Sequence, residues 1–237
     1  MQKSIIHYDK KILTPHDRFG VAGDKSVRGF VVLENDKGVR KGENLVVLGG
    51  REFLASKLAN LSGNNALDFT KYEIRYFGVG KGGASSDDNG NLTVKNGPYA
   101  NDTDLYNPLK ISPSNSADGI TYIDNGYLKY IYADGSLGSG ITFETEDHNI
   151  TTATDTITVS AYTVIKFTMF IREDEMTALK PFEFNEAGLW AVEYGDDGKP
   201  VTNSNGTANK RLFAHFTTSS KFIEESDQLK IEWYILV

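Results

Sequence analysis

Apolar and polar residues alternate most clearly at the end of the chain. Every second position there is apolar: Leu229, Ile231, Trp233, Ile235 and Val237. A period of two is typical of a β-strand with one buried face, because successive side chains of a strand point to opposite faces of its sheet. We therefore predict a core strand at the C-terminus, with Trp233 as a large buried side chain.

The same period extends over residues 161–171, where one face carries Ile165, Phe167, Met169 and Ile171. Shorter apolar runs between Gly, Asn and Asp residues predict further strands at 29–34, 44–48, 72–79, 127–132, 140–143, 156–160 and 212–217. Many short strands joined by such turns favour an antiparallel β-sandwich or a barrel-like domain. We expect residues 1–43 to form an N-terminal arm and the first strand, and residues 44–237 to form this domain.

One segment has helical spacing. The pair Gly49-Gly50 precedes residues 51–61, and Gly63 follows at a position typical of a C-terminal cap. Apolar residues of this segment share one helical face: Phe53, Leu54, Leu58 and Leu61. We expect one short amphipathic helix that buries this stripe against a sheet. Leu58→Asp is then predicted to unfold the protein, and Lys57→Asp to be tolerated.

Two stretches are too polar to supply much core, namely residues 1–26 and a long loop at about 80–119. The second is longer than a plain connection, so we expect either short strands in it, such as 91–94, or an excursion that orders against a neighbour. We hypothesise that both stretches contact a neighbouring copy of the chain or another partner.

The charge balance narrows the classes of partner. The formal net charge is −7, and an acidic surface repels phosphate, so we do not expect nucleic acid as a main partner. The absence of cysteine excludes disulfides, thiolate metal sites and a cysteine nucleophile. No segment has the length of apolar sequence that a membrane span needs, and the N-terminus does not resemble a signal peptide, so we expect synthesis in a cytoplasm and no membrane partner.

Two patterns suggest ligand binding. Residues 78–83 match G-x-G-x-x-G after a predicted strand, but the chain continues into a loop, whereas a dinucleotide site needs a helix there. The groups Asp87-Asp88-Asn89 and Asp102-x-Asp104-x-x-Asn107 offer oxygens to calcium but lack the EF-hand order. We interpret the first as a flexible glycine turn and the others as turn formers.

Candidate catalytic groups do not converge in the sequence. The histidines, His7, His16, His148 and His215, lack zinc-ligand spacing, and we expect His215 at a surface or interface. The acidic runs 144–147 and 172–175 contain the paired carboxylates that glycoside hydrolysis needs, but they are expected in turns, solvated. We therefore predict no enzyme and no catalytic, cofactor-binding or metal-binding residues.

Four tyrosines lie close together in the sequence: Tyr122, Tyr127, Tyr130 and Tyr132. They are candidates for a sugar-stacking face. Core and interface roles are the alternative, because strands and protein interfaces are both enriched in tyrosine.

Several segments form a pattern when they are taken in order: residues 44–47 with 50–55, the strand ending at 78–80, and residues 184–190, 211–216 and 229–235. Together they resemble virion structural proteins of tailed bacteriophages, of the tail, neck and baseplate sort. The resemblance implies a non-catalytic virion component that assembles as an oligomer with other virion proteins, and it carries no active-site residues. It also implies a strand and turn at 185–189, with Asn185 and Gly188 in a tight turn and Leu189 in the core.

Two other functions remain open from the sequence. A carbohydrate- or receptor-binding β module of a fibre is supported by the tyrosines and the β architecture. An enzyme such as a glycan hydrolase is supported only by the scattered acidic residues.

Overall fold

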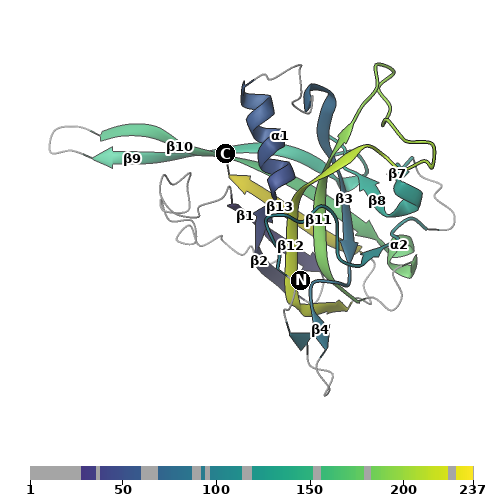
Figure 1. The fold of residues 1–237 in the computed structure, drawn as a ribbon. Helices are drawn as coiled ribbons and strands as arrows, with labels where there is room; N and C mark the ends of the chain where they lie inside the picture. The colour runs from purple at the N-terminus through teal and green to yellow at the C-terminus, as the bar shows by residue number, and fades with distance from the viewer. Residues whose placement is uncertain are drawn as a thin grey trace.

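The chain folds as a mainly β protein (Figure 1). The structure, a computed structural model, describes residues 28–35, 38–59, 69–86, 92–93, 97–113, 119–151, 156–178, 183–223 and 228–236. The strands are β1 (Arg28–Asn35), β2 (Gly38–Val46), β3 (Tyr72–Gly80), β4 (Ser85–Ser86), β5 (Leu92–Thr93), β6 (Pro108–Leu109), β7 (Tyr122–Ile123), β8 (Leu128–Tyr130), β9 (Gly140–Thr151), β10 (Thr156–Arg172), β11 (Glu183–Glu193), β12 (Lys210–Ile223) and β13 (Gln228–Leu236). The helices are α1 (Leu48–Ala59) and α2 (Glu173–Ala178), with 3-10 turns η3 (Phe69–Lys71), η4 (Asp124–Gly126) and η5 (Ser136–Gly138).

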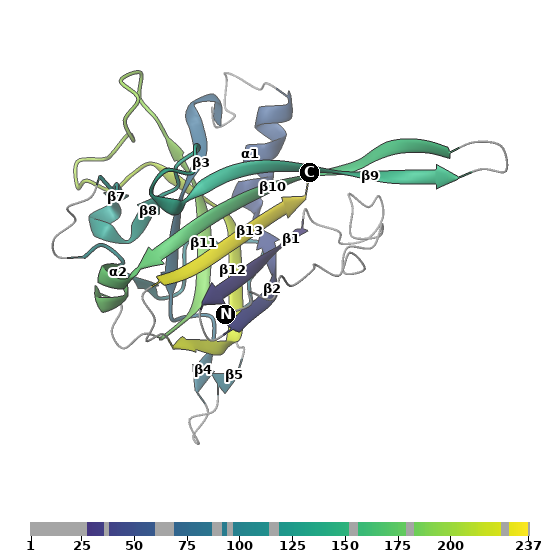
Figure 2. The same cartoon turned by 180° about the vertical axis from the view of Figure 1, so that it is seen from behind.

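The main sheet has the strand order β7-β8-β3-β11-β12-β2-β1-β13-β10-β9, with β6 beside β3. Its two halves meet at a narrow join, where β12 and β2 share only the pairs Ala214–Val46 and His215–Leu45. The halves pack on each other like the two layers of a sandwich, and Figure 2 shows the β2–β1–β13–β10 half in front of the β3–β11–β12 half. The predicted antiparallel β-sandwich class is therefore confirmed.

The main core lies between the two layers. The predicted core strand is β13, in which Trp233 is fully buried, and the apolar face of β10 is buried at Phe167, Met169 and Ile171. A second apolar cluster covers the other face of the β3–β11–β12 layer and contains Tyr76, Trp190, Leu212 and residues from loops. Both faces of β11 and β12 are consequently buried, which is why the sequence of these strands lacks a simple alternation.

The long polar loop contributes to both clusters. Leu105, in the second cluster, is 6% exposed, and Ile111, in the main core, is 0% exposed. Among its described residues, these are the only two buried apolar side chains, so the loop supplies little core, as predicted. The loop contains β4, β5 and β6, and its segment 97–113, here called the covering loop, lies on the same chain's sheet.

The helix packs through only part of the predicted face. α1 begins at Leu48, so both glycines lie inside it, and a Cβ atom at Gly50 would sit 2.1 Å from the carbonyl oxygen of Phe213. Phe53 is buried, with its ring 5.9 Å from that of Phe213, whereas Leu58 is 85% exposed. The buried face thus follows positions 50, 53 and 54, so Phe53 and Leu54 pack as predicted, and the prediction that Leu58 is buried was wrong. Leu61 and Gly63 lie outside the described residues.

β9 and β10 form a hairpin that projects from the sandwich (Figures 1 and 2). β10 is one strand over both of its predicted pieces, with a bulge between Ser160 and Tyr162. The acidic run 144–147 lies within β9, so the turn expected there was wrong. β13 pairs with β10 only from Val164 onward, so in the described chain the distal part of the hairpin pairs only with itself.

The N-terminal region joins the sheet through β1 and β2. β2 spans the boundary that was expected between residues 43 and 44, and residues 1–27 lie outside the described part of the chain. Among the described residues, no helix combines the length and apolar character needed to cross a membrane.

Candidate functional site

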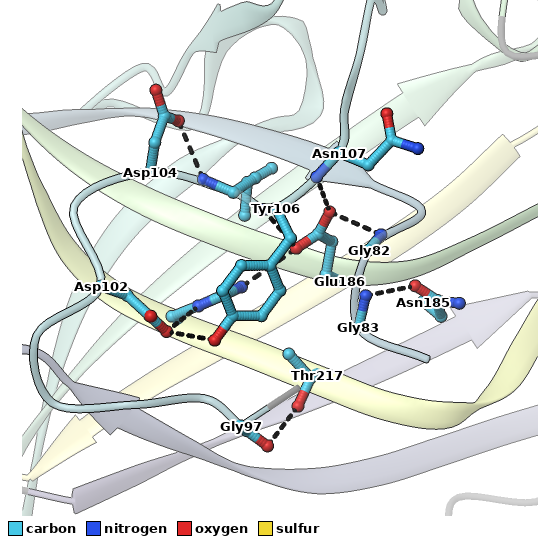
Figure 3. A network of polar contacts seen from close by, with 12 residues as sticks. Gly82, Gly83, Gly97, Asp102, Asp104, Tyr106, Asn107, Asn185, Glu186 and Thr217 are labelled. Carbon is cyan, nitrogen blue, oxygen red and sulfur yellow. Dashed lines mark hydrogen bonds and ion pairs between the residues drawn. The ribbon is translucent and has the colours of Figure 1, made fainter. Parts of the chain in front are cut away.

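A fully buried carboxylate, that of Glu186 in β11, is the centre of the polar network in Figure 3. Its Oε1 atom accepts hydrogen bonds from the backbone amides of Gly82 (2.7 Å) and Asn107 (2.8 Å). Its Oε2 atom accepts one from the amide of Tyr106 (3.0 Å) and lies 3.3 Å from Nε2 of His215. One side chain of the sheet therefore binds the turn after β3 and the covering loop together.

His215 extends the network to a second carboxylate. It lies in β12, is 0% exposed, and its Nδ1 atom is 2.7 Å from Oδ2 of Asp102. The same oxygen of Asp102 accepts hydrogen bonds from the amide of Tyr99 and the hydroxyl of Tyr106, each at 2.8 Å. The ring of Tyr106 packs edge-on against the imidazole at 5.0 Å, so the covering loop is bound to β12 by polar and aromatic contacts.

The glycine-rich turn is shaped by this carboxylate. β3 ends at Gly80, and a Cβ atom there would lie 2.3 Å from Oε1 of Glu186. A Cβ atom at Gly82 would lie 2.3 Å from Cβ of Tyr106. The amide of Gly83 donates to Oδ1 of Asn185 at 2.8 Å. The motif thus serves close backbone approach within the chain, which agrees with its interpretation as a glycine turn rather than a dinucleotide fingerprint.

The protonation of these groups follows from their surroundings. Burial acts to raise the pKa of Glu186, but the hydrogen bonds from His215 and from three backbone amides hold that pKa below its ordinary value. Burial, followed by the hydrogen bond to Asp102 and its charge, raises the pKa of Tyr106, which keeps the phenol as a donor. A neutral imidazole has a single N–H, so His215 donates to both carboxylates only when both of its nitrogens carry a proton.

A second buried polar cluster lies at β8, on the opposite side of β3 from β11. Nζ of Lys129 in β8 is 2.7 Å from Oε2 of Glu175 in α2, and both side chains are almost fully buried. The hydroxyl of Tyr122 donates to the other oxygen of Glu175, and the amide of Arg172 donates to Oε2 at 2.6 Å. Burial lowers the pKa of Lys129 despite the adjacent carboxylate. This cluster fixes α2 against β8 in the way that Glu186 fixes the covering loop.

The structure changes the interpretation of several candidate residues. His215 is buried, so the expected surface or interface position was wrong. Glu175, expected to be solvated with its acidic run, is also buried. Asn185 and Gly188 lie inside β11, so the turn expected there was wrong, whereas Leu189 fills the core as expected.

The remaining candidate metal ligands do not come together at one site among the described residues. Asp104 accepts from the amide of Leu105, whereas Asp102 faces His215, and no group of three or more His, Asp or Glu side chains among the described residues is arranged for a metal ion. Residues 87–89, His7 and His16 lie outside the described residues, and nothing is described of the side chain of His148.

The four candidate tyrosines do not form one flat exposed face. Tyr122 is bonded to Glu175, and Tyr130 packs edge-on against Tyr132 with the ring centroids 4.9 Å apart. Tyr127 alone among them is clearly exposed, at 40%.

The sequence did not predict the roles of Glu186 and Lys129. A signal was present for Glu186, because it is the only ionisable residue in the apolar run 184–192 of a buried strand. An ionisable group in such a strand is almost always paired. Its partners cannot be identified in the sequence, because they come from positions 29 to 104 residues away.

The oxygens of Glu186 each accept two contacts from the protein, so this centre binds the chain's own loops. The fold and the site define a sandwich-type β protein in which buried ionisable residues anchor long loops to the sheet. Comparisons with family models, with curated proteins and with solved structures gave no match to this chain.

Proposed function

We propose that the chain is a non-enzymatic structural subunit of a tailed-phage virion, located in the neck, tail or baseplate. In this role it assembles with copies of itself and with other virion proteins. The observation that carries the proposal is the projecting β9–β10 hairpin, whose distal part pairs only with itself among the described strands.

An isolated two-stranded ribbon is at best marginally stable in water. It also presents unpaired backbone N–H and C=O groups along its edge, which readily pair with another chain. A ribbon of this length therefore gains stability by contact with a neighbouring subunit. Such a contact is a common mode of assembly, because main-chain hydrogen bonds supply the affinity.

The internal anchoring supports the same role. Glu186 and Glu175 bind long loops and a short helix to the sandwich through buried hydrogen bonds. Networks of this kind rigidify a subunit when all their members are satisfied. Most of the segments that carry the resemblance to virion proteins also lie together, because β3, β11, β12 and the end of β2 are consecutive in the sheet, whereas residues 229–235 lie in β13, beyond β1.

A variant with a shortened hairpin tests the proposal. Thr145 and Thr163 face each other in the ladder, so residues 146–162 can be replaced by Asn-Gly, a dipeptide that closes two-residue hairpins. We expect light scattering to give a multiple of 26.2 kDa for the native chain and a smaller assembly for the folded variant. Mass spectrometry of purified particles is expected to find the chain. A native chain that stays monomeric and is missing from particles would refute the proposal.

A carbohydrate- or receptor-binding module of a fibre is the second candidate. The specific observation in its favour is a set of exposed tyrosines: Tyr99 at 51%, Tyr127 at 40% and Tyr106 at 36%. A glycan array with the native chain and with Tyr99→Ala and Tyr127→Ala variants tests this candidate. Glycan binding that these substitutions abolish would place it ahead of the structural role.

A further inference from the structure

The outer edge of β9 is the longest free strand edge in the described part of the chain. β9 is the last strand of the sheet and pairs only with β10 among the described strands, over Gly140–Thr151. At the opposite end of the sheet, the terminal strand β7 has only two residues. Long exposed edges are templates for strand addition, and natural proteins usually cover or shorten them.

The sheet register places the start of β1 beside the base of the hairpin. Gly29 is paired with Ile235, Ile235 with Ile165, and Ile165 with Phe143. Residues 1–27 therefore join the sandwich at the level of Phe143, three strands from β9, and β1 then runs away from the hairpin. The start of β1 and the base of the hairpin thus lie at the same end of the sandwich, and a segment of 27 residues has a reach of up to about 90 Å when extended.

The charges of the two elements are complementary. β9 contains three carboxylates, those of Glu144, Glu146 and Asp147, and no Lys or Arg. Residues 1–27 contain five Lys or Arg and three Asp, a net charge of +2 in a chain of net charge −7. Pairing β9 with β9 of another copy would set carboxylates near carboxylates, which is unfavourable across strands. A basic strand is therefore the better occupant of this edge.

The N-terminal segment also has the composition of an added strand. It contains the apolar pairs Ile5-Ile6 and Ile12-Leu13, and Phe143 at the base of β9 is 71% exposed. To reach the outer edge of β9, the segment of the same copy must cross β13, β10 and β9. The segment of a neighbouring copy meets no such obstacle.

We infer that the outer edge of β9 binds residues 1–27 of a second copy of this chain as an added strand. The inference deepens the proposed structural role and depends on self-assembly. It names the surface, the occupant and the charge pairing through which the copies associate.

The absence of cysteine allows a direct test by cross-linking, because a single introduced thiol has no background. One preparation carries Thr142→Cys, at an exposed position of β9, and another carries Ser4→Cys or Thr14→Cys. The two preparations are mixed, allowed to assemble and treated with a bis-maleimide. We expect a covalent dimer. Thr202→Cys, at an exposed position in the loop before β12, replaces Thr142→Cys in the control and is expected to give no dimer.

Charge reversal tests the proposed specificity. Glu144→Lys with Glu146→Lys is expected to lower the dimer yield several-fold, and Lys10→Glu with Lys11→Glu on the other copy is expected to restore it. Cross-linking confined to a doubly substituted single chain would overturn the inference, because the segment would then occupy its own β9. A multimer that gives no cross-link at either segment position would overturn the inference and leave the proposed function standing. A chain that remains at 26.2 kDa at every concentration would refute both the inference and the proposed function.

Discussion

Nε2 of His215 lies 3.3 Å from Oε2 of Glu186, and neither side chain has any exposed surface. The two residues belong to neighbouring central strands, β12 and β11, and connect them to the covering loop. Removing the carboxylate of Glu186 would leave the imidazole of His215 and three backbone amides buried without this acceptor.

Glu186→Ala is therefore expected to lower the free energy of unfolding by about 3–5 kcal/mol, because it leaves His215 and three amides without their acceptor. Urea denaturation measures the change. Glu73→Ala is the matched control, since Glu73 is exposed and forms only a surface pair with Arg75, so a change within about 0.5 kcal/mol is expected. Equal losses in both variants would contradict the anchoring role.

Glu232 predicts a dependence of stability on pH. Burial acts to raise its pKa, but hydrogen bonds from Lys230 and Tyr234, together with the charges of two lysines, hold that pKa at about 2. The unfolded chain, with its pKa near 4.5, binds this proton more readily, so the contribution is present above pH 4.5 and is lost as the pH falls toward 2. Unfolding free energies across this window are expected to fall less steeply for Glu232→Gln than for the native chain. Parallel curves would contradict the prediction.

Lys57 and Leu58 of α1 offer a paired test of which side chains contact the rest of the protein. Lys57 packs over the ring of Phe53 at 5.6 Å and donates to the carbonyl of Thr70 at 2.8 Å, whereas Leu58 is 85% exposed. We now expect Leu58→Asp to change the unfolding free energy by less than about 0.5 kcal/mol. Lys57→Asp is expected to destabilise by about 1 kcal/mol, because it removes the cation and the hydrogen bond. Thermal melts of the two variants measure the difference in stability. A larger loss for Leu58→Asp than for Lys57→Asp would support the face predicted from the sequence.

Replacing Trp233 by alanine is expected to leave a large cavity in the main core. Its side chain is 0% exposed at the centre of the main core, so Trp233→Ala is expected to cost about 3–5 kcal/mol. Phe143→Ala, at a position that is 71% exposed, serves as the aromatic control and is expected to be nearly neutral. Chemical denaturation of both variants measures the difference. A Trp233→Ala protein that melts within a degree or two of the native one would contradict the burial of this residue.

Gly82 tests the close approach of the turn and the covering loop. Gly82→Ala introduces a Cβ atom 2.3 Å from Cβ of Tyr106, so the loop must move away from Glu186. We expect faster cleavage of residues 97–113 in limited proteolysis and a loss of about 1–3 kcal/mol of stability. Lys81→Ala, one residue earlier, keeps the backbone hydrogen bond from Lys81 to Asn107 and is expected to show neither effect.

The strands could be predicted from the sequence because their signal is local. Alternation over a few residues is enough to place β13 and the buried face of β10. The helix is present as predicted, and Phe53 packs as predicted, but Leu58 does not, because Gly50 allows α1 to approach the backbone of β12 closely. That approach centres the contact on Phe53, and it depends on a strand more than 150 positions away.

The buried polar centres could not be predicted for a related reason. Asp102 and His215 are separated by 113 positions, and Lys129 and Glu175 by 46. Each of these residues is of a type that is common in turns or on protein surfaces. Only the folded sheet brings them together, so the sequence indicated at most the lone Glu186 in an apolar strand.

The projecting hairpin also makes β10 a mechanical link. β10 passes as a single strand from the ribbon into the sandwich, where Val164 to Arg172 pair with Leu236 to Gln228. A pull along the ribbon therefore loads these hydrogen bonds simultaneously in shear, rather than one after another as in peeling. Forced unfolding is governed by the unfolding rate. Traction on the hairpin tip is thus resisted by the β10–β13 ladder, at the centre of one layer, before it reaches the loops and the helix.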